Sequence, residues 1–284
     1  MATSFAQETT VRAHGDRSGR YLAHFGPDWW GPRAPQGGVV AATTLRAMST
    51  ALDNPAHRLR TSTTVFARTV PAGAVAIDVD VLRAGRSVSQ VQGTVHGEAD
   101  PEPGHRTLAV FGRERKGWEH LDFTELQMPS VPPPEDCEPL PADRPEASIF
   151  DVSFWRRMEL GNVDFHYGWE HDWQGGRAQG MRWIRYIDTP RVADGTVDPL
   201  AYLPFVDVIP GAVFQRVGAS APRFFAPTLD LTVHFLDRTE HDWTLQVMRM
   251  RRATHGYGSG EMELWSRDGA LLAHASQTMF FAAL

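Results

Sequence analysis

Three polar residues in the C-terminal half of the chain occupy positions where their chemistry stands out. Asp207 is the only charge in the apolar run LPFVDVIP, where burying an unpartnered carboxylate costs several kcal/mol. Thr228 begins an expected strand, and Gln277 is an amide among core-facing positions of the last expected strand, AHASQTMFF. A carboxylate can accept a proton, while a hydroxyl and an amide can hold a water molecule by hydrogen bonds.

Each of these residues also has an ordinary structural interpretation. Asp207 could face solvent on a helix, and threonine is common in strands, so Thr228 alone indicates little. Gln277 could be a surface amide on an edge strand. The residue types alone therefore leave both interpretations open.

Other candidate groups are weaker. Asp164 with His166, and His171 with Asp172, carry metal-ligating side chains, but their spacing is uneven and no third site accompanies them. We therefore predict no metal site and no cofactor. Cys137 lies in a proline-rich segment and is not expected to be a nucleophile. A GxSxG motif is absent, which argues against an α/β-hydrolase.

The elements that would position these residues repeat along the chain. Pro227–Arg238 alternates in polarity as a strand does, with Thr228 on the face opposite Leu229, and Arg58–Arg68 is a looser copy. An apolar helix is expected before each copy, over Val39–Leu52 and over Leu200–Val217. In each half the pattern predicts a loop, a helix and three strands, which indicates duplication of one α+β unit.

The second helix has a clear start. Asp198 and Pro199 supply an N-cap and a first-turn proline. Pro204 and Pro210 interrupt the helix, so a kink is expected near each.

Prolines also mark the division of the chain. Residues 116–147 carry seven of them and predict a connector, because proline at this density neither pairs in a central strand nor holds a helix. The predicted units are residues 1–115 and residues 148–284.

Composition limits the class of protein. The chain has 284 residues, of which 42% are hydrophobic, so it can bury a sizeable core. A net charge of −6 argues against nucleic acid or an anionic membrane as the main partner. No window has the length of a membrane span and the N-terminus lacks a signal peptide's apolar stretch. With a single cysteine, these features predict a cytoplasmic protein.

The order and register of several segments resemble the acyl-CoA thioesterase II (TesB-like) family, which has a double hotdog fold. The segments are PQGGVVAATTLRA, VDVLRAGRSVSQVQ, DPLAYLPFVD, PTLDLTVHF and HGYGSGEMELWSRDGALLAHASQ. The resemblance covers nearly the whole chain apart from the connector. It implies two antiparallel sheets, each wrapped around a long helix, and hydrolysis of a fatty acyl-CoA thioester.

The resemblance also implies roles for the three polar residues. Asp207, Thr228 and Gln277 coincide with the family's aspartate, threonine and glutamine, which orient a hydrolytic water. The oxyanion would meet backbone N–H groups at a helix N-terminus of the other unit, where Gly37 and Gly38 let the backbone approach closely.

The first unit lacks this set. When the two copies are aligned, Thr228 corresponds to Leu59, Gln277 lies near Arg113 and Asp207 lies near Gly38. The first copy would therefore be structural or would bind the CoA moiety. A non-catalytic acyl-CoA-binding protein remains the alternative. A hotdog dehydratase is disfavoured because no Asp and His pair follows the second helix start. The outer sheet edges lead us to expect a homodimer.

Overall fold

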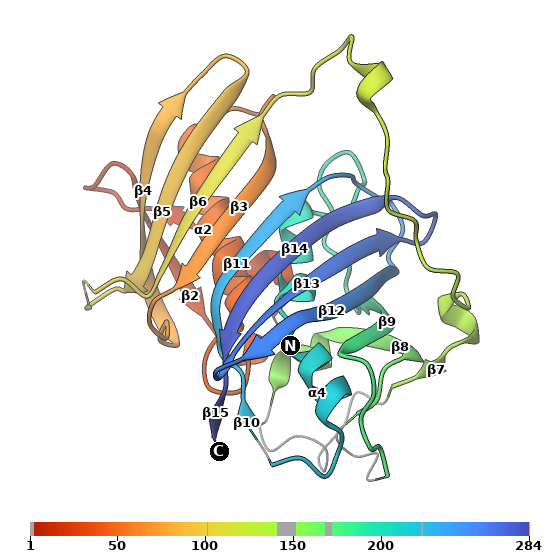
Figure 1. Ribbon diagram of the computed structural model, residues 1–284. Helices are drawn as coiled ribbons and strands as arrows, with labels where there is room; N and C mark the ends of the chain where they lie inside the picture. The colour runs from red at the N-terminus through yellow and green to blue at the C-terminus, as the bar shows by residue number, and fades with distance from the viewer. Residues whose placement is uncertain (1–2, 101, 141–151, 168–171, 223, 284) are drawn as a thin grey trace.

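A single large antiparallel sheet forms the body of the molecule in the computed structural model (Figure 1). The structure describes residues 3–100, 102–140, 152–167, 172–222 and 224–283. The sheet has thirteen strands in the order β1-β2-β4-β5-β6-β3-β11-β14-β13-β12-β9-β8-β7, and β10 pairs separately with β15. The strands are β1 (Arg12–Ala13), β2 (Arg20–Phe25), β3 (Arg58–Phe66), β4 (Gly73–Ala84), β5 (Val88–Gly97), β6 (His105–Gly112), β7 (Glu138–Pro139), β8 (Met158–Asp164), β9 (Gln179–Tyr186), β10 (Phe224–Phe225), β11 (Thr228–Phe235), β12 (Thr244–Thr254), β13 (Tyr257–Ser266), β14 (Leu271–Phe280) and β15 (Ala282–Ala283).

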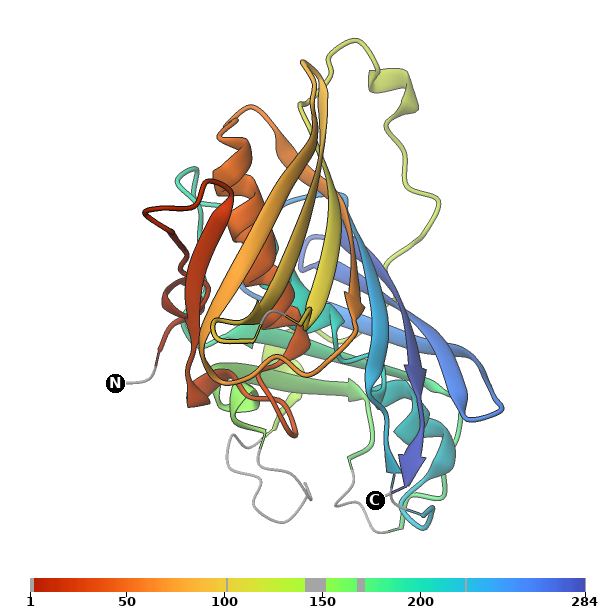
Figure 2. The ribbon, with the colours of Figure 1, turned by 90° about the vertical axis from the view of Figure 1, so that its left-hand side faces the viewer.

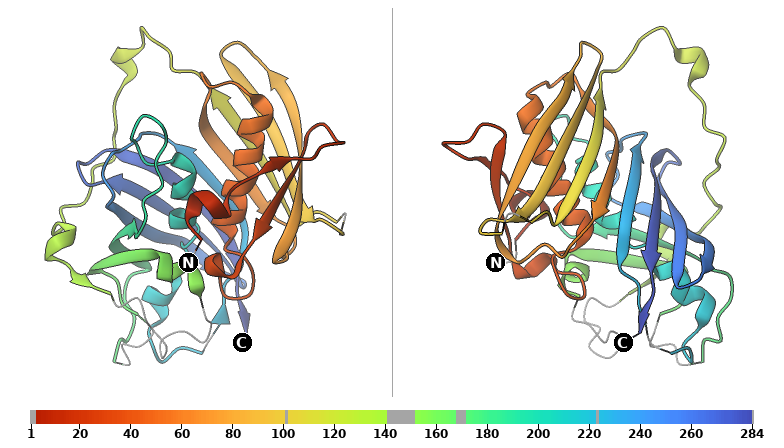
Figure 3. Two further views of the ribbon diagram at one scale, coloured as in Figure 1. Left: turned by 180° about the vertical axis from the view of Figure 1, so that it is seen from behind. Right: turned by 60° about the vertical axis from the view of Figure 1, so that its left-hand side comes forward.

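The helices are short except for one. They are α1 (Phe5–Glu8), α2 (Gly37–Leu52), α3 (Tyr202–Val206) and α4 (Gly211–Val217), with 3₁₀ turns at Pro27–Trp29, Glu119–Leu121, Pro134–Asp136, Ser153–Arg157 and Pro199–Ala201. Seen from behind, α2 and the segment containing α3 lie together on the inner side of the curved sheet (Figure 3). This arrangement is the double hotdog predicted from the sequence.

The two halves join through their first long strands. β3 and β11 pair antiparallel, with Thr63 opposite Thr232. The hydroxyls of these two threonines lie 2.9 Å apart, and the Thr61 hydroxyl donates to the Val233 carbonyl at 3.0 Å. The sheets of the two halves therefore join edge to edge through β3 and β11. Figure 2 shows the strands of both halves side by side across this junction.

Each half contains four long strands after its helix, and our prediction of three was wrong. β3 to β6 follow α2, and β11 to β14 follow α4. The repeat extends to irregularities in register: bulges interrupt β3 between Leu59 and Thr61, and β11 between Thr228 and Asp230. The matching bulges place Leu59 and Thr228 at equivalent positions, as the sequence register predicted.

The first expected helix is confirmed and begins two residues earlier than predicted. The Gln36 side chain caps α2 by accepting a hydrogen bond from the Val39 N–H at 2.9 Å, and Asp53 ends it in the left-handed conformation with φ 44°. Ten of its residues are buried, mostly small or β-branched ones that let the sheet approach closely.

The second expected helix is broken rather than kinked. Asp198 caps a 3₁₀ turn by accepting from the Leu200 N–H at 3.0 Å, after which α3 ends at Val206 and α4 begins at Gly211. Pro210 lacks the N–H that would continue the helix from the preceding turn. Asp207 consequently lies at the C-terminal end of α3 instead of inside a continuous helix.

The second half holds α3 firmly. The Gln246 amide on β12 donates to the Phe205 carbonyl at 2.5 Å, and the Tyr186 hydroxyl donates to the Ala201 carbonyl at 2.7 Å. Our expectation that no window is long and apolar enough to cross a membrane was wrong: among the described residues, Pro199–Val217 is, and 56% of its 18-residue apolar window is buried inside the fold. Such burial is that of a core helix.

The core runs through both halves as one cluster, from Val39 on α2 to Met279 on β14. A smaller cluster around Trp183 and Trp265 is covered by the end of the expected connector, where the Trp183 indole N–H donates to the Pro132 carbonyl at 2.8 Å. Residues 138–139 of that segment form β7. Its remainder from 141 to 147, and the start of the second unit to 151, lie outside the described residues.

Candidate functional site

The structure brings Asp207, Thr228 and Gln277 together from three different elements. Asp207 ends α3, Thr228 is the first residue of β11, and Gln277 lies on the neighbouring strand β14. The Thr228 hydroxyl and the Gln277 amide nitrogen each donate to Asp207 Oδ1 at 3.3 Å. The Gln277 amide nitrogen also donates to the Thr228 hydroxyl oxygen, so the three side chains form one network.

A bulge turns Thr228 toward this network. Thr228 pairs with Met279 and Leu231 pairs with Gln277, and the register shifts between Thr228 and Asp230. Residues directly opposite in an antiparallel pair point to the same face, so Thr228 shares the inner face with Met279 and Gln277. Strict alternation had placed Thr228 with Asp230 on the other face; that assignment was wrong because a bulge inserts one residue.

The other carboxylate oxygen is held by the N-terminal half. Asp207 Oδ2 accepts the Gly38 backbone N–H at 2.9 Å and the Gln36 side-chain amide at 3.1 Å. A side chain at Gly37 would place its Cβ 2.6 Å from Asp207 Oδ2, and one at Gly38 would overlap the Leu203 carbonyl. The two glycines are therefore needed for α2 to approach α3.

Loss of solvation makes the partly buried Asp207 an unusually weak acid. The loss of solvation raises the pKa of Asp207 from 3.8 to about 7, against the lowering influence of the hydrogen bonds from the Gly38 N–H and the Thr228 hydroxyl. A carboxyl with this pKa is half ionised near neutral pH, which suits a general base. No charged side chain of the described residues hydrogen-bonds to Asp207.

Two polar groups beside the carboxylate have unused hydrogen-bonding capacity. Gln277 is 1% exposed, and its carbonyl oxygen Oε1 has no partner in the described part of the chain. The Gly37 N–H, at the N-terminus of α2, likewise has no acceptor among the described residues. The site thus offers a base, a buried acceptor and a backbone donor within one small region.

The equivalent place in the N-terminal half carries different chemistry. Leu59 occupies the position that is equivalent to Thr228, as predicted. The strand register, however, places Ala109 and not Arg113 opposite Ser62, in the position that Gln277 has opposite Leu231. Arg113 follows the end of β6. Our assignment of Gln277 to the neighbourhood of Arg113 was therefore wrong, because it counted past the last strand.

The counterpart of Asp207 also differs from our prediction. The N-cap residues Gln36 and Asp198 occupy equivalent positions, and each reaches the helix of the other half: Gln36 contacts Asp207, and Asp198 Oδ2 accepts from Arg46 Nη2 at 2.7 Å. Arg46 thus makes to Asp198 the cross-half contact that Asp207 makes to Gln36. Gly38 is instead the partner that donates to Asp207. An ion pair fills the position that the carboxylate occupies in the other half.

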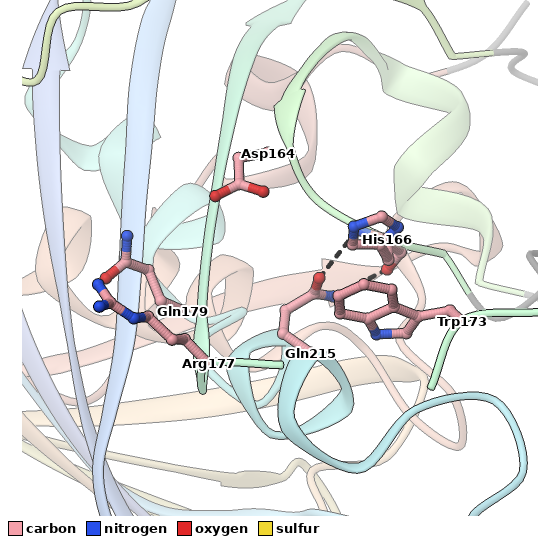
Figure 4. Close-up of a pocket in the computed structure, with 6 residues that line it drawn as sticks. All are labelled: Asp164, His166, Trp173, Arg177, Gln179 and Gln215. Atoms are coloured by element: carbon pink, nitrogen blue, oxygen red, sulfur yellow. Dashed lines mark hydrogen bonds between the residues drawn. The ribbon is translucent and has the colours of Figure 1, made fainter. Parts of the chain in front are cut away.

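The remaining sequence candidates lie elsewhere. Asp164 and His166 line a separate surface pocket with Trp173, Arg177, Gln179 and Gln215, shown in Figure 4. The His166 ring stacks on Trp173, with centroids 3.5 Å apart, and Gln215 bonds its backbone. No metal-binding group of three His, Cys, Asp or Glu side chains occurs within the described ranges. His171 lies outside them.

Gln36 is the site residue that sequence reasoning missed. A polar residue directly before Gly37 and Gly38 is consistent with an N-cap, which is a signal for a helix start and says nothing of a contact with Asp207. Only the folding of α2 against α3 brings the two side chains together.

Comparison with known proteins gives a consistent result. The model of the acyl-CoA thioesterase N-terminal domain matches residues 26–112, and that of the acyl-CoA thioesterase C-terminal domain matches residues 134–281. No curated protein sequence gave a match.

Solved structures share the fold along the full length of the chain. A conserved protein of unknown function with a hot dog fold from Alicyclobacillus acidocaldarius is 22% identical, with a TM-score of 0.80 and 100% of both chains covered. The acyl-CoA thioesterase II TesB2 of Mycobacterium marinum is 17% identical, with a TM-score of 0.75 and 99% of both chains covered.

Proposed function

Since the chain belongs to the acyl-CoA thioesterase family and is a thioester hydrolase, we propose that it hydrolyses fatty acyl-CoA to the free acid and CoA. The attacking group is a water molecule oriented by Asp207, Thr228 and Gln277. No covalent intermediate with the protein is required.

One observation carries this proposal: a carboxylate with a pKa of about 7 lies in one hydrogen-bond network with Thr228 and Gln277. Both contacts to Asp207 Oδ1 measure 3.3 Å, which is long for hydrogen bonds and therefore easily exchanged for contacts to a water. The unpartnered Gln277 Oε1 can accept a hydrogen bond from that water.

The reaction then proceeds in two steps. Asp207 takes a proton from the water while the water oxygen attacks the carbonyl carbon of the thioester. The π electrons of the carbonyl move onto the carbonyl oxygen, which becomes the oxyanion. The Gly37 N–H, at the positive end of α2, donates to this oxyanion. When the tetrahedral intermediate collapses, the C–S bond breaks, and the proton on Asp207 passes to the departing sulfur of CoA.

The N-terminal half has a supporting role in this scheme. It supplies Gly37 and Gly38 to the site, while its own equivalent positions hold Leu59, Ala109 and the Arg46 ion pair and cannot orient a water. The assignment of residues 1–115 and 148–284 as supporting and catalytic units, joined by a connector, belongs to this proposal.

We place the reaction in the cytoplasm and in lipid metabolism, with the chain acting as a homodimer. The outermost strands β1 and β7 contain only two residues each and offer few backbone groups for pairing between copies, so the homodimer would have to form through a surface other than these sheet edges. Light scattering during size-exclusion chromatography measures the oligomeric state.

The deciding experiment is a panel of acyl-CoA thioesters of increasing chain length, assayed by release of free thiol. We expect turnover with wild type and loss of turnover with Asp207→Asn. Binding of acyl-CoA without thiol release at any chain length would replace this proposal with a binding function. Full activity of Asp207→Asn would show that the site is elsewhere.

A further inference from the structure

We propose that Gln36, contributed by the N-terminal half, is a positioning residue that holds the Asp207 carboxylate in its working orientation. The inference rests on the proposed function, because it concerns the same base. It extends the catalytic set to a side chain that reaches Asp207 from the opposite half of the molecule.

The two ends of the Gln36 amide have separate tasks. Its oxygen accepts the Val39 N–H at 2.9 Å, which caps α2, and its nitrogen donates to Asp207 Oδ2 at 3.1 Å. Because a backbone N–H can only donate, the cap fixes which end of the amide is oxygen. The nitrogen must then face the carboxylate. Gln36 is 5% exposed, so water cannot readily replace it.

The two carboxylate oxygens of Asp207 have different hydrogen-bond partners. Oδ2 receives Gly38 and Gln36, both from the N-terminal half, while Oδ1 faces Thr228 and Gln277. Two donors on Oδ2 prevent the carboxylate from rotating about its last bond, so Oδ1 stays directed at the water. A small displacement of a catalytic group can cost about 10²-fold in rate.

The same contact favours the ionised base. All four groups that hydrogen-bond to Asp207 are neutral donors: one backbone amide, one hydroxyl and two side-chain amides. Removing one donor to a buried carboxylate disfavours its charged form. Loss of Gln36 therefore acts on the ionisation of the base, which a purely structural helix cap does not do.

Asp198 provides a matched control within the same chain. It caps the start of the second helical segment by accepting from the Leu200 N–H and, like Gln36, reaches across to the other half, where it meets Arg46. It likewise combines a helix cap with a contact to the other half, although it accepts in both contacts, and its partner is outside the proposed catalytic set. Asp198→Asn keeps a capping residue and changes only the ion pair.

The test compares Gln36→Met, Gln36→Glu and Asp198→Asn by thiol release from one good acyl-CoA substrate across pH. Gln36→Met removes both polar ends. Gln36→Glu keeps an oxygen to cap α2 but replaces the donor with a second negative charge.

We expect about a 10- to 100-fold fall in kcat for Gln36→Met with little change in KM. The acidic limb of kcat/KM should move to higher pH, and it should move further for Gln36→Glu. Asp198→Asn should leave the acidic limb at the same pH even if its melting temperature is lower than that of wild type. Thermal melting reports folding of each variant, and Gln36→Glu decides the matter if Gln36→Met does not fold.

The inference is overturned if folded Gln36 variants keep the wild-type kcat and the wild-type acidic limb of kcat/KM. It is also overturned if these variants lose turnover while the acidic limb stays at the same pH. The proposed function has a separate criterion. If Asp207→Asn is inactive while the Gln36 variants behave as wild type, only the positioning role fails. If Asp207→Asn is fully active, the proposed site itself fails.

Discussion

At the scale of single residues, Asp207 carries the strongest expectation. Asp207→Asn removes the base but keeps the size of the side chain, and the Thr228 hydroxyl and the Gln277 amide can both reorient to match an amide. Turnover should fall by about 10²- to 10⁴-fold, as is usual when a general base is lost, while KM changes little. Steady-state kinetics with acyl-CoA measure both constants. Equal turnover in wild type and variant would contradict the assignment.

The stability of the same variant provides its control. Because the pKa of Asp207 is raised to about 7 by folding, the folded state binds this proton more tightly than the unfolded chain does. The protonated Asp207 therefore stabilises the folded state relative to the unfolded chain. This contribution is complete below about pH 4 and is lost as pH rises through about 7. Asp207→Asn should therefore melt no lower than wild type at pH 8, which separates lost chemistry from lost folding.

The pH dependence of wild type follows from the same group. Only the ionised carboxylate can take a proton, so kcat/KM should rise as pH increases and level off above about 7. A rate measured from pH 5 to 9 with one substrate tests this. An acidic limb near pH 4 would show that the base is a solvated carboxyl and not the buried Asp207.

Thr228 and Gln277 should behave as one unit. Each alanine variant loses one of two groups that hold the same water, so each single change should cost at most about 10²-fold in kcat. The double variant should be far less damaged than the product of the two losses predicts, because the second group has little left to orient. Multiplicative losses in kcat would show that the two side chains act independently.

The sequence predicted much of this site but not its surroundings. Asp207 stood out because it interrupts an apolar run and Gln277 because it interrupts a core face, while the resemblance to the thioesterase family implied that these two residues and Thr228 form one set. The sequence missed Gln36, since a contact between residues 171 positions apart leaves no local pattern. It also misplaced Thr228 on its strand, because a bulge changes the alternation and has no fixed sequence signal.

At the scale of elements, the close approach of α2 and α3 depends on Gly38. A methyl group there would meet the Leu203 carbonyl and the Pro204 nitrogen, both backbone atoms that cannot turn aside. Gly38→Ala should therefore lower the free energy of unfolding by about 1–3 kcal/mol and reduce turnover, because the two helices must separate. Denaturant unfolding measures the first effect.

Gly15 serves as the comparison for that variant. Nothing lies within 4 Å of a Cβ at Gly15, so Gly15→Ala should leave stability and turnover unchanged. Equal stability of the two alanine variants would mean that α2 and α3 can move apart at no cost.

The elements themselves were predicted to different degrees. α2 was found because an apolar sequence with several alanines and a single charge, Arg46, favours a buried helix. The second helix was expected to continue through Pro204 and Pro210 with kinks, yet α3 ends at Val206 and α4 begins at Gly211. The Gln246 amide on β12 holds the Phe205 carbonyl near the end of α3. The strand count was one too low in each half, although Pro71 and Gly85 mark the turns that separate β3, β4 and β5.

At the scale of the whole molecule, the halves should stay together without the connector. A protease site inserted after Glu125, in the exposed segment that bows away from the body in Figure 1, allows the chain to be cut after folding. Activity should survive cleavage, because β3 pairs with β11 and one core crosses both halves. Each half purified alone should be inactive. Loss of activity in step with cleavage would assign the connector a part in catalysis.

The placement of Gln36, Gly37 and Gly38 against Asp207 also limits how this gene can change. A duplicated unit usually leaves each copy free to be deleted or exchanged between relatives, since either copy can serve alone. Here the Asp207 carboxylate and two of the groups that hydrogen-bond to it, Gln36 and Gly38, are encoded in different copies. Recombination that replaces one half with that of a distant relative must preserve both sides of this contact at once, so the two copies can only be inherited as a pair.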